Sequence, residues 1–408
     1  MIWCYNFNML QRKANTYRLY PDAGQSETLA RIAGACRAVY NLALEQRRDW
    51  WGKYKTKTGK SISFAGQCRE LTDLRRDVDW LRDVPIHPLQ QALRDLDKAY
   101  QNFFSGRGGY PSPRCKGRND SFRFPDPAGL RVERTGRKTG RIKLPKLGWV
   151  AFRGWYDLPG AIKNITVSRR AGQWFASVQC EREVPDPAPS ELPAVGIDMG
   201  VSVFAALSDG TMIAPKNVGQ KALKALQKAQ RSIARKKKGS NNRRKAILRV
   251  QRLHARVANA RKDFIHKIST IIAKNHGTVV VEDLKMRNMT ASATGTIEEP
   301  GRNIRQKSGL NRSILDQAWG LFFTFLSYKL PERGGRLIKV PPAYTSQTCS
   351  ACGHVDRRNR INQARFSCIA CGHTENADTN SSKIILRRAD CPLKPVEGHR
   401  IGRPCEAG

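Results

Sequence analysis

Four cysteines near the C-terminus constrain the fold of this chain more than any other feature. They form two Cys-x-x-Cys pairs, Cys349/Cys352 and Cys368/Cys371, and a glycine follows the second cysteine of each pair. Each such turn aims two thiolates at one point, and two turns complete a tetrahedral zinc site. Glycine suits the tight turn because it has no Cβ. The spacing therefore predicts a zinc ribbon, and four unrelated core cysteines fit it poorly.

The chain is strongly basic for its length. Its 408 residues include 73 Lys and Arg against 34 Asp and Glu, which gives a formal net charge of +39. This excess is far beyond what solubility requires, and it favours a polyanionic partner held through many phosphate contacts. The composition therefore indicates a protein that binds nucleic acid. A merely basic surface is the less favoured alternative.

The remaining sequence features indicate a cytosolic protein. Seven further cysteines are scattered without a disulfide framework, at positions 4, 36, 68, 115, 180, 391 and 405. Such usage suits a reducing compartment. The first ten residues lack the basic start and cleavage site of a signal peptide. No stretch approaches the ~18 apolar residues that a membrane span needs, so we expect no membrane partner.

The first 185 residues predict a strand, then helices, then short strands. A strand ends before Pro21, and Asp22 or Ser26 can cap the amphipathic helix that follows it. Further helices are expected near 66–80 and 86–105. Short strands separated by turn signals follow and suggest a small β-barrel; they are expected around 130–134, 141–144, 148–153, 162–168 and 173–181.

Residues 106–127 differ in composition from the segments on either side. They are rich in Gly, Pro, Arg and aromatic residues. The basic side chains are suited to neutralising phosphates, while Tyr110, Phe122 and Phe124 could stack on bases. The equally favoured alternative is a loop between domains with its aromatic side chains turned inward.

A proline-rich linker near residues 184–193 marks the clearest domain boundary, and strands with acidic residues follow it. Asp198 lies in a strand that is otherwise apolar, and a hairpin follows at about 203–214. An unpaired buried carboxylate is costly, so Asp198 needs a partner, which a metal ion would supply. A later buried strand ends in Glu282 and Asp283, and another strand is expected at 336–340.

Residues 216–262 predict two long basic helices, broken near Gly239 and Ser240. This segment has 17 Lys or Arg and no Asp or Glu, so no intrahelical salt bridge can relieve the repulsion. A polyanion lying across the helices is the better explanation. Beyond them we expect a third helix at 263–275, a mobile loop over 287–311, and a helix near 312–331.

Three carboxylates, Asp198, Glu282 and Asp378, lie on separate predicted elements, with Asp378 in a helix expected from about 376 to 388. If folding brings them together, their repulsion demands cations, and carboxylate oxygens suit Mg²⁺ or Mn²⁺. A pair of such ions ~4 Å apart activates a water and stabilises the leaving oxygen in phosphodiester cleavage. Each acid alone fits a cap or an ion pair equally well. Asp283 is a rival to Glu282 and would point to the opposite face of the strand.

Four sequence blocks resemble those of a known family: GIDMG (196–200), VVVEDLKMRNM (279–289), TSQTCSACGH (345–354) and ENADTNSS (375–382). In order and separation they are similar to the blocks of the TnpB family, the transposon-encoded RNA-guided DNA endonucleases related to type V CRISPR effectors. The N-terminal half matches more weakly, through RLYP, RAVYN and GYPSPRCKGR. One departure is Ser381-Ser382, where the family has small apolar residues. We expect little effect, because serine is nearly isosteric with alanine.

The resemblance implies a fold class. It is an α/β RNase H-like (RuvC-like) nuclease domain with an inserted Cys4 zinc ribbon, preceded by a small β-barrel (wedge) domain that a helical recognition domain interrupts. The implied segments are a wedge of 1–25 and 115–185, a recognition domain of 26–114, a linker of 186–193, a nuclease domain of 194–344 and 375–390, a zinc ribbon of 345–374, and a disordered tail of 391–408.

The resemblance also implies a function. It assigns Asp198, Glu282 and Asp378 as catalytic ligands of Mg²⁺ or Mn²⁺, favouring Glu282 over Asp283, and gives a structural Zn²⁺ to the four cysteines. The implied protein is encoded by a transposable element and holds a guide RNA derived from the transposon end. It cuts double-stranded DNA beside a short motif. We expect it to be monomeric in its RNA complex and to work in the cytoplasm of a bacterial or archaeal cell, on the nucleoid.

Three alternatives stay open at this stage. The first is a compact CRISPR effector, with the same nuclease and a guide that comes from an array. The second is a transposition accessory that binds nucleic acid without cutting, which explains the charge and the ribbon but leaves the three acids unexplained. The third is a DDE-type transposase that joins strands.

Overall fold

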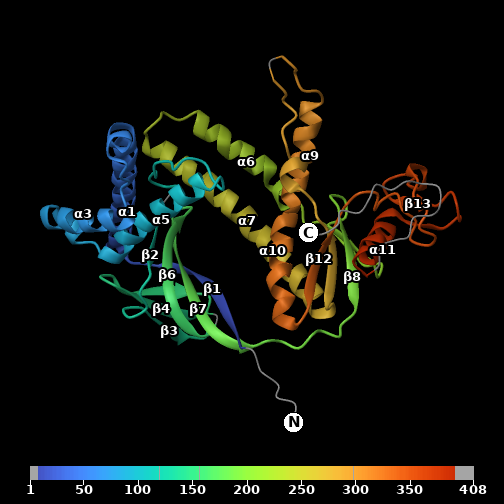
Figure 1. Cartoon of the computed structure of the whole chain (residues 1–408), viewed down its shortest axis with the longest axis horizontal. Coiled ribbons are helices and arrows are strands. Elements are labelled where there is room, and N and C mark those ends of the chain that lie inside the picture. Colours follow the sequence, from blue (N-terminus) through green and yellow to red (C-terminus); the bar gives the residue numbers. More distant parts are fainter. Residues whose placement is uncertain (1–7, 119, 156, 297, 391–408) are drawn as a thin grey trace, which may run out of the picture. The chain divides into compact units, whose positions relative to one another are not determined.

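The computed structural model describes residues 8–118, 120–155, 157–296 and 298–390 (Figure 1). The chain divides into two compact units, Met1–Pro185 (unit 1) and Asp186–Gly408 (unit 2). The predicted disordered tail, 391–408, and the first seven residues of the predicted wedge lie outside the described residues. Within the described part, no helix is both long and apolar enough to cross a membrane.

The helices of unit 1 pack around two long members, α1 (Ala23–Trp50) and α5 (Ile86–Phe104). Asp22 begins α1, because its side chain accepts from the Gln25 backbone N–H while the Gln25 side chain accepts from the Asp22 N–H. The predicted helices near 66–80 and 86–105 are both present. The other helical segments of this unit are η1 (Trp51–Lys55), α2 (Thr56–Thr58), α3 (Phe64–Asp77) and α4 (Asp79–Arg82).

The strands of unit 1 form one antiparallel sheet in the order β2-β6-β7-β1-β5-β4-β3. All five strands predicted for residues 130–181 are present. The two outermost strands, β2 and β3, are not paired with each other, so closure into a barrel stays a prediction. The strands are β1 (Asn8–Tyr20), β2 (Ser121–Phe124), β3 (Arg131–Gly136), β4 (Thr139–Leu144), β5 (Gly148–Arg153), β6 (Ala161–Arg170) and β7 (Gln173–Pro185).

The aromatic residues of segment 106–127 divide between core and surface. Phe122 and Phe124 occupy alternate positions of β2, both on its buried face, and are 5% and 2% exposed. The idea that these two stack on bases is therefore wrong, because strand alternation turns them into the core. Tyr110 is 50% exposed and packs edge-on against Tyr100 and Phe103, so its stacking on a base stays a prediction.

Unit 2 is built on a five-stranded mixed sheet in the order β10-β9-β8-β11-β12. The first three strands pair antiparallel, while β8, β11 and β12 run parallel. Three antiparallel strands followed by two parallel ones is the RNase H-like order, as the resemblance implied. The strands are β8 (Ala194–Met199), β9 (Ala205–Leu207), β10 (Met212–Ile213), β11 (Thr278–Glu282) and β12 (Arg336–Val340).

The helices of unit 2 confirm the predicted break near Gly239 and correct the predicted bounds of two other helices. The basic segment forms α6 (Val218–Ala234) and α7 (Asn241–Asn275), interrupted around Gly239, which has φ +84°. The predicted third helix, 263–275, is the continuation of α7, because no cap or breaker stops the helix at 262. The predicted helix 312–331 is two helices, α9 (Ile304–Gln317) and α10 (Trp319–Lys329), divided at Ala318 in a left-handed conformation.

The segment predicted as a loop, 287–311, is partly helical. It begins within α8 (Met286–Met289) and ends within α9, so the irregular stretch is shorter than expected. Figure 1 shows this stretch projecting from the end of α9, away from the sheet of unit 2. The remaining short elements are η2 (Pro331–Arg333), η3 (Arg357–Asn359), β13 (Arg365–Ser367) and β14 (Thr374–Asn376).

The last helix, α11 (Ala377–Asp390), packs directly on β8, β9 and β11. The approach is close because position 196 is glycine. A Cβ there would collide with the Ser382 carbonyl oxygen and lie 2.7 Å from the Leu386 backbone nitrogen. Ser381 and Ser382 on α11 are 1% and 0% exposed. Small residues on both elements therefore allow α11 to lie close against the strand that carries Asp198.

Candidate active site and metal centre

Two predicted acids lie at the same end of the unit 2 sheet. Asp198 is near the carboxyl end of β8, and Glu282 is the last residue of β11. The two strands are parallel neighbours, with Ile197 opposite Val281, so the following residues of the two strands are level with each other. The third acid, Asp378, lies in the first turn of α11, which packs on β8.

The charges of the three acids act on one another. The pKa of Asp198 is raised to about 7, first by burial and then by the carboxylates of Glu282 and Asp378. Burial also raises the pKa of Glu282 and that of Asp378. A buried carboxylate beside two others resists ionisation unless a cation joins it. The fold therefore brings together the three acids that the sequence placed on separate elements.

Glu282 is held in one orientation. It is 8% exposed, and its Oε1 accepts a hydrogen bond of 2.6 Å from the Thr345 hydroxyl. This hydrogen bond, and then the charge of Arg388 on α11, oppose the rise in the pKa of Glu282. Arg388 itself donates to the backbone carbonyls of Pro341 and Ala343, both at 2.6 Å. The loop after β12 is thereby tied to α11 beside the acids.

Asp283 does not share this environment. Its side chain is 40% exposed and pairs with Lys285 at 2.5 Å. That hydrogen bond lowers the pKa of Asp283, the opposite of the shift at Glu282. Adjacent residues of a strand point to opposite faces, so only Glu282 turns toward Asp198.

Arg360 belongs to the site and was missed by the sequence analysis. Its Nη2 lies 3.3 Å from Asp378 Oδ1, and its charge lowers the pKa of Asp198 against the effect of burial. Arg360 lies between the two Cys-x-x-Cys pairs, in a segment with several other arginines. No motif distinguishes it from those neighbours. Only the folded ribbon shows that Arg360 pairs with one of the three acids.

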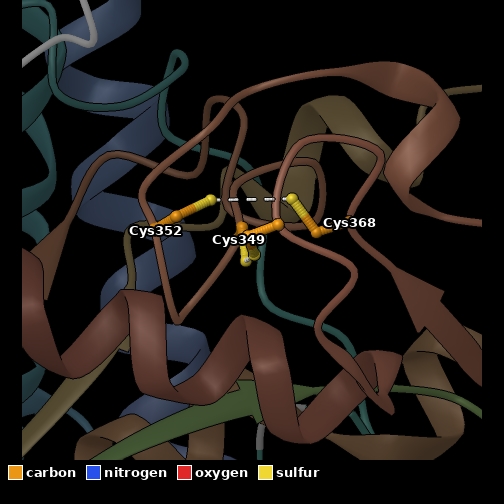
Figure 2. A group of neighbouring side chains, drawn as sticks. Cys349, Cys352 and Cys368 are labelled. Atoms are coloured by element: carbon orange, nitrogen blue, oxygen red, sulfur yellow. Dashed lines mark hydrogen bonds between the residues drawn. The ribbon is translucent and has the colours of Figure 1, made fainter.

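The four cysteines form a cluster in the ribbon that could hold a metal ion. Their sulfur atoms all lie within 4.8 Å of one another. The Cys349 and Cys371 sulfurs are 3.7 Å apart, and those of Cys352 and Cys368 are 3.6 Å apart, the pair joined by the dashed line in Figure 2. Tetrahedral zinc with Zn–S bonds of ~2.3 Å places its ligands ~3.8 Å apart. The arrangement therefore fits Zn²⁺ as it stands.

The two cysteine turns share the same backbone geometry. The Gly353 N–H donates to the Cys349 carbonyl and the Gly372 N–H to the Cys368 carbonyl, each at 3.0 Å. Both glycines adopt positive φ, +78° and +71°, where a side chain would be strained. This is why glycine follows each Cys-x-x-Cys pair.

The ribbon also fixes the start of α11. The Asn376 side chain accepts from the backbone N–H groups of Asp378 and Thr379. Asn380 is fully buried; its amide donates to the Thr348 carbonyl and accepts from the Ser350 N–H, both at 2.8 Å. Asn380 thus joins α11 to the first cysteine turn, while Asp378 nearby in the same turn of the helix remains beside Asp198.

The three acids differ from the four cysteines in how closely their possible ligand atoms approach one another. Among the described residues, the four cysteines are the group whose ligand atoms lie close enough to hold an ion without rearrangement. The three carboxylates do not form such a group in the part of the chain that the structure describes. Their oxygens are nevertheless the donors that hard divalent cations prefer, and their raised pKa values follow from burial and shared negative charge.

A cationic surface lies on α6. Figure 1 shows α6 running beside α7. A cavity of about 660 Å³ is lined by this helix and the residues just after it: Lys224, Gln227, Lys228, Arg231, Ser232, Arg235 and Lys236. These residues are named below as the α6 cation cluster. Because it has five cations and no acid, the cluster suits a phosphate backbone.

Comparison with known proteins supports this picture. Residues 177–293 match the model of a family described as a probable transposase, and residues 319–385 match the TNB domain of Cas12f1-like proteins. A protein of Escherichia coli K12 named "Putative RNA-guided DNA endonuclease InsQ" is 44% identical over 97% of both chains. The chain belongs to the TnpB family. The resemblance carried by the four sequence blocks is therefore confirmed.

A second relative, from Streptomyces pristinaespiralis, bears a similar name and is 35% identical over 92% of this chain and 89% of its own. A helix-turn-helix model also matches residues 9–56 of this TnpB-family chain. In the structure these residues form β1, α1 and the turns after it, rather than two short helices.

Two solved structures share the fold of this TnpB-family chain. A Cas12f1–sgRNA–target DNA complex matches with a TM-score of 0.55 and 14% identity, covering 93% of this chain and 98% of the other. The mini-RNA-guided endonuclease CRISPR-Cas_phi3 matches with a TM-score of 0.52 and 10% identity, covering 96% and 94%. At these identities the likeness concerns the fold alone.

Proposed function

We propose that this chain is an RNA-guided DNA endonuclease of a transposable element, which hydrolyses phosphodiester bonds with the help of divalent metal ions. The observation that carries the proposal is the meeting of Asp198, Glu282 and Asp378 at one end of the unit 2 sheet. The names of the Escherichia coli and Streptomyces relatives support it, and the transposase family model supports an origin in a mobile element.

The three acids would hold Mg²⁺ or Mn²⁺, whose chemistry is to activate a water and stabilise the leaving oxygen. The protein's own part is orientation. Thr345 fixes Glu282 through a hydrogen bond, and Arg360 pairs with Asp378. The zinc ribbon has a structural role, because Asn380 ties its first cysteine turn to the helix that carries Asp378.

The partners follow from charge and fold. A guide RNA derived from the transposon end neutralises part of the +39 charge, and the α6 cation cluster is one of its contacts. The guide pairs with one strand of a double-stranded DNA target, so that base pairing reads the sequence while the protein reads a short adjacent motif. One protein copy binds each RNA, in the cytoplasm of a bacterial or archaeal cell.

The domain roles are part of the same proposal. Residues 1–25 and 115–185 act as a wedge domain, which includes the sheet of unit 1 and closes into a barrel. Its helices, within 26–114, form the recognition domain. After the linker at 186–193, residues 194–344 and 375–390 form the nuclease domain, with the zinc ribbon at 345–374 between them.

The first experiment is to express the chain with its native flanking DNA and to sequence the RNA that copurifies. We expect one defined RNA that ends in sequence from beyond the transposon boundary. That RNA then supplies the guide for a cleavage assay with a matched DNA target. The Asp198→Ala variant should retain the RNA and lose cutting, and an Asp198→Ala protein that still cuts would contradict the assigned site.

The same experiment separates the alternatives. An RNA transcribed from a repeat array would identify a compact CRISPR effector. Mixed cellular RNA, or none, together with no cutting of guided targets, would favour an accessory that binds nucleic acid without cleaving it. Joining of transposon ends without a guide would favour a strand-transferring transposase.

A further inference from the structure

Tyr344 has an unusual backbone conformation beside the acids. Its φ is +61°, in the left-handed region that non-glycine residues seldom enter. Such strain persists only where the surrounding structure over-determines it, and it tends to gather at functional sites. The observation therefore prompts the question of what an aromatic ring does at this position.

The loop around Tyr344 is held firmly. The Tyr344 carbonyl accepts from the backbone N–H groups of Gln347 and Thr348, both at 3.1 Å, and from the Thr348 hydroxyl at 2.7 Å. On the other side, Arg388 binds the carbonyls of Pro341 and Ala343. The strained residue is thus fixed from both directions by bonds to ordered neighbours.

The Tyr344 side chain does not explain the strain by packing. It is 57% exposed, and within the described part of the chain we find no ring contact or hydrogen bond made by its side chain. The next residue, Thr345, binds Glu282 directly. An exposed ring on a rigid loop is therefore held one residue away from a group that touches the acid site.

We propose that Tyr344 is a positioning residue whose ring stacks on an unpaired base of the DNA strand that enters the acid site. This inference rests on the proposed nuclease function. Base–aromatic stacking tolerates any sequence, because every base has a π-face. It therefore suits an enzyme whose sequence is read by a guide. The rigid loop holds the ring ready before the strand arrives.

Three substitutions separate the ring from the backbone. Tyr344→Ala removes the ring and keeps the strain, Tyr344→Phe keeps the ring without the hydroxyl, and Tyr344→Asn removes the ring in a residue that tolerates positive φ. Loss of one stacked base weakens binding by about 5- to 150-fold. Cutting of a guided target by the Ala and Asn variants should therefore slow by about tenfold, while Phe stays within about twofold.

The stability of the variants makes the test sharper. The Tyr344→Asn variant should have a higher Tm than the native protein, because asparagine relieves the backbone strain. It should nevertheless cut the target as slowly as the Tyr344→Ala variant. A purely structural role for Tyr344 predicts the reverse, with Asn as active as the native protein. The matched control is Tyr328→Ala, which removes a tyrosine that is 40% exposed on α10 of the same unit. It should leave the cutting rate unchanged.

The substrate supplies the second half of the test. An abasic nucleotide placed at successive positions near the cut should slow the native enzyme at the stacked position. The same change should have no added effect in Tyr344→Ala. Wild-type cutting rates for the Ala and Asn variants, or additive effects of the abasic site and Tyr344→Ala at every position, would overturn the proposal.

A readout that needs no cutting keeps this inference distinct from the proposed function. In the Asp198→Ala background, a target strand carrying 5-iododeoxyuridine near the cut site should crosslink to the peptide that contains Tyr344. If the native protein does not cut guided DNA, the proposed function fails, and the crosslink still decides whether Tyr344 meets the strand. A crosslink only to guide RNA, or only to other peptides, would contradict our assignment.

Discussion

At the scale of single residues, the site depends on which way each carboxylate points. Glu282 and Asp283 are adjacent, and composition alone makes them equal candidates. Glu282 is buried beside Asp198, whereas Asp283 pairs with Lys285 at the surface. The two acids therefore form a matched pair for testing the proposed site.

We predict that Glu282→Gln abolishes guided cutting while Asp283→Asn leaves the rate within about twofold. The first change keeps the size of the side chain but removes a charge that a divalent cation needs. The second removes only an exposed ion pair, worth about 0–1 kcal/mol. Single-turnover cleavage with copurified RNA measures both. Equal losses in the two variants would contradict the assignment of Glu282.

A residue away from the acids gives a prediction about pH. Lys329 is 7% exposed, and its Nζ donates to the His266 carbonyl and to the hydroxyls of Ser269 and Thr270. Burial, and then the charge of Arg333, lower its pKa from 10.5 to about 8, with Glu332 opposing. Between these values the unfolded chain binds the proton and the folded chain does not.

The free energy of unfolding should therefore rise with pH between about 8 and 10.5 through this group. The gain is at most about 3.5 kcal/mol, because one pKa unit corresponds to about 1.4 kcal/mol. Lys329→Met removes the titration. Urea unfolding of both proteins at pH 7.5 and 10 should show that the native protein gains stability relative to the variant. A constant difference would rule out the shifted pKa.

At the scale of elements, the site depends on how closely α11 approaches the sheet. Gly196 on β8 and the small residues Ser381 and Ser382 on α11 allow backbone to meet backbone. Asp378 lies on this helix, so its position depends on where the helix packs. Asn380 joins the same helix to the ribbon through a hydrogen bond. A change in this contact should therefore move an acid without touching it.

We predict that Gly196→Ala destabilises the protein and abolishes cutting, because the new methyl group forces α11 away from β8. Overpacking of this kind costs about 1–3 kcal/mol or more. The control is Gly309→Ala on α9, where a Cβ would meet nothing within 4 Å. That change should instead raise the Tm, because alanine favours a helix. Thermal unfolding and cleavage assays compare the two.

The ribbon gives a second prediction at this scale. We expect one zinc ion per chain by elemental analysis. Cys368→Ser should lower the zinc content and the Tm, since ligand loss unfolds small zinc modules. Cutting should fall as well, because the anchor between Asn380 and the first cysteine turn is released. As the control, Cys180→Ser changes a buried cysteine in the sheet of unit 1 and should leave the zinc content unaltered. Full zinc occupancy in the Cys368 variant would contradict the assignment.

At the scale of the whole molecule, net charge decides the class of partner. In a chain with a formal charge of +39, the positive side chains repel one another, and the protein as a whole attracts polyanions. Such binding is strongly dependent on salt, because each neutralised phosphate releases a counterion. The α6 cation cluster offers a defined place to measure this.

We predict that Lys224→Gln, Lys228→Gln and Arg231→Gln together weaken binding of the guide RNA and flatten its salt dependence. The slope of log K against log salt should fall by about 0.7–0.9 for each phosphate that the protein no longer neutralises. As the control, Arg76 and Arg82 of unit 1 already pair with Asp73 and Asp79. Replacing these two by Gln should leave the slope nearly unchanged. Filter binding over a range of salt concentrations measures both.

Much of this protein can be predicted from sequence because its signals are local. Cysteine spacing specifies the ribbon, since two short turns fix four sulfur atoms whatever the rest of the chain does. Residue periodicity predicts α1, α5 and the strands, because core faces repeat along each element. The lack of acids in 216–262 and the order of the four blocks likewise need no tertiary contact to be recognised.

The rest was decided by tertiary structure, because it depends on which elements meet. The resemblance already favoured Glu282 over Asp283, but the physical reason appears only in the fold, where Glu282 turns toward Asp198 and Asp283 pairs with Lys285. Arg360 becomes part of the site only when the ribbon folds back on α11. The inward position of Phe122 comes from the pairing of β2 with β6, and the strain at Tyr344 comes from bonds on both sides of its loop. Local patterns specify elements, whereas a site is made of side chains that are distant in sequence, so their meeting is a property of the packed fold.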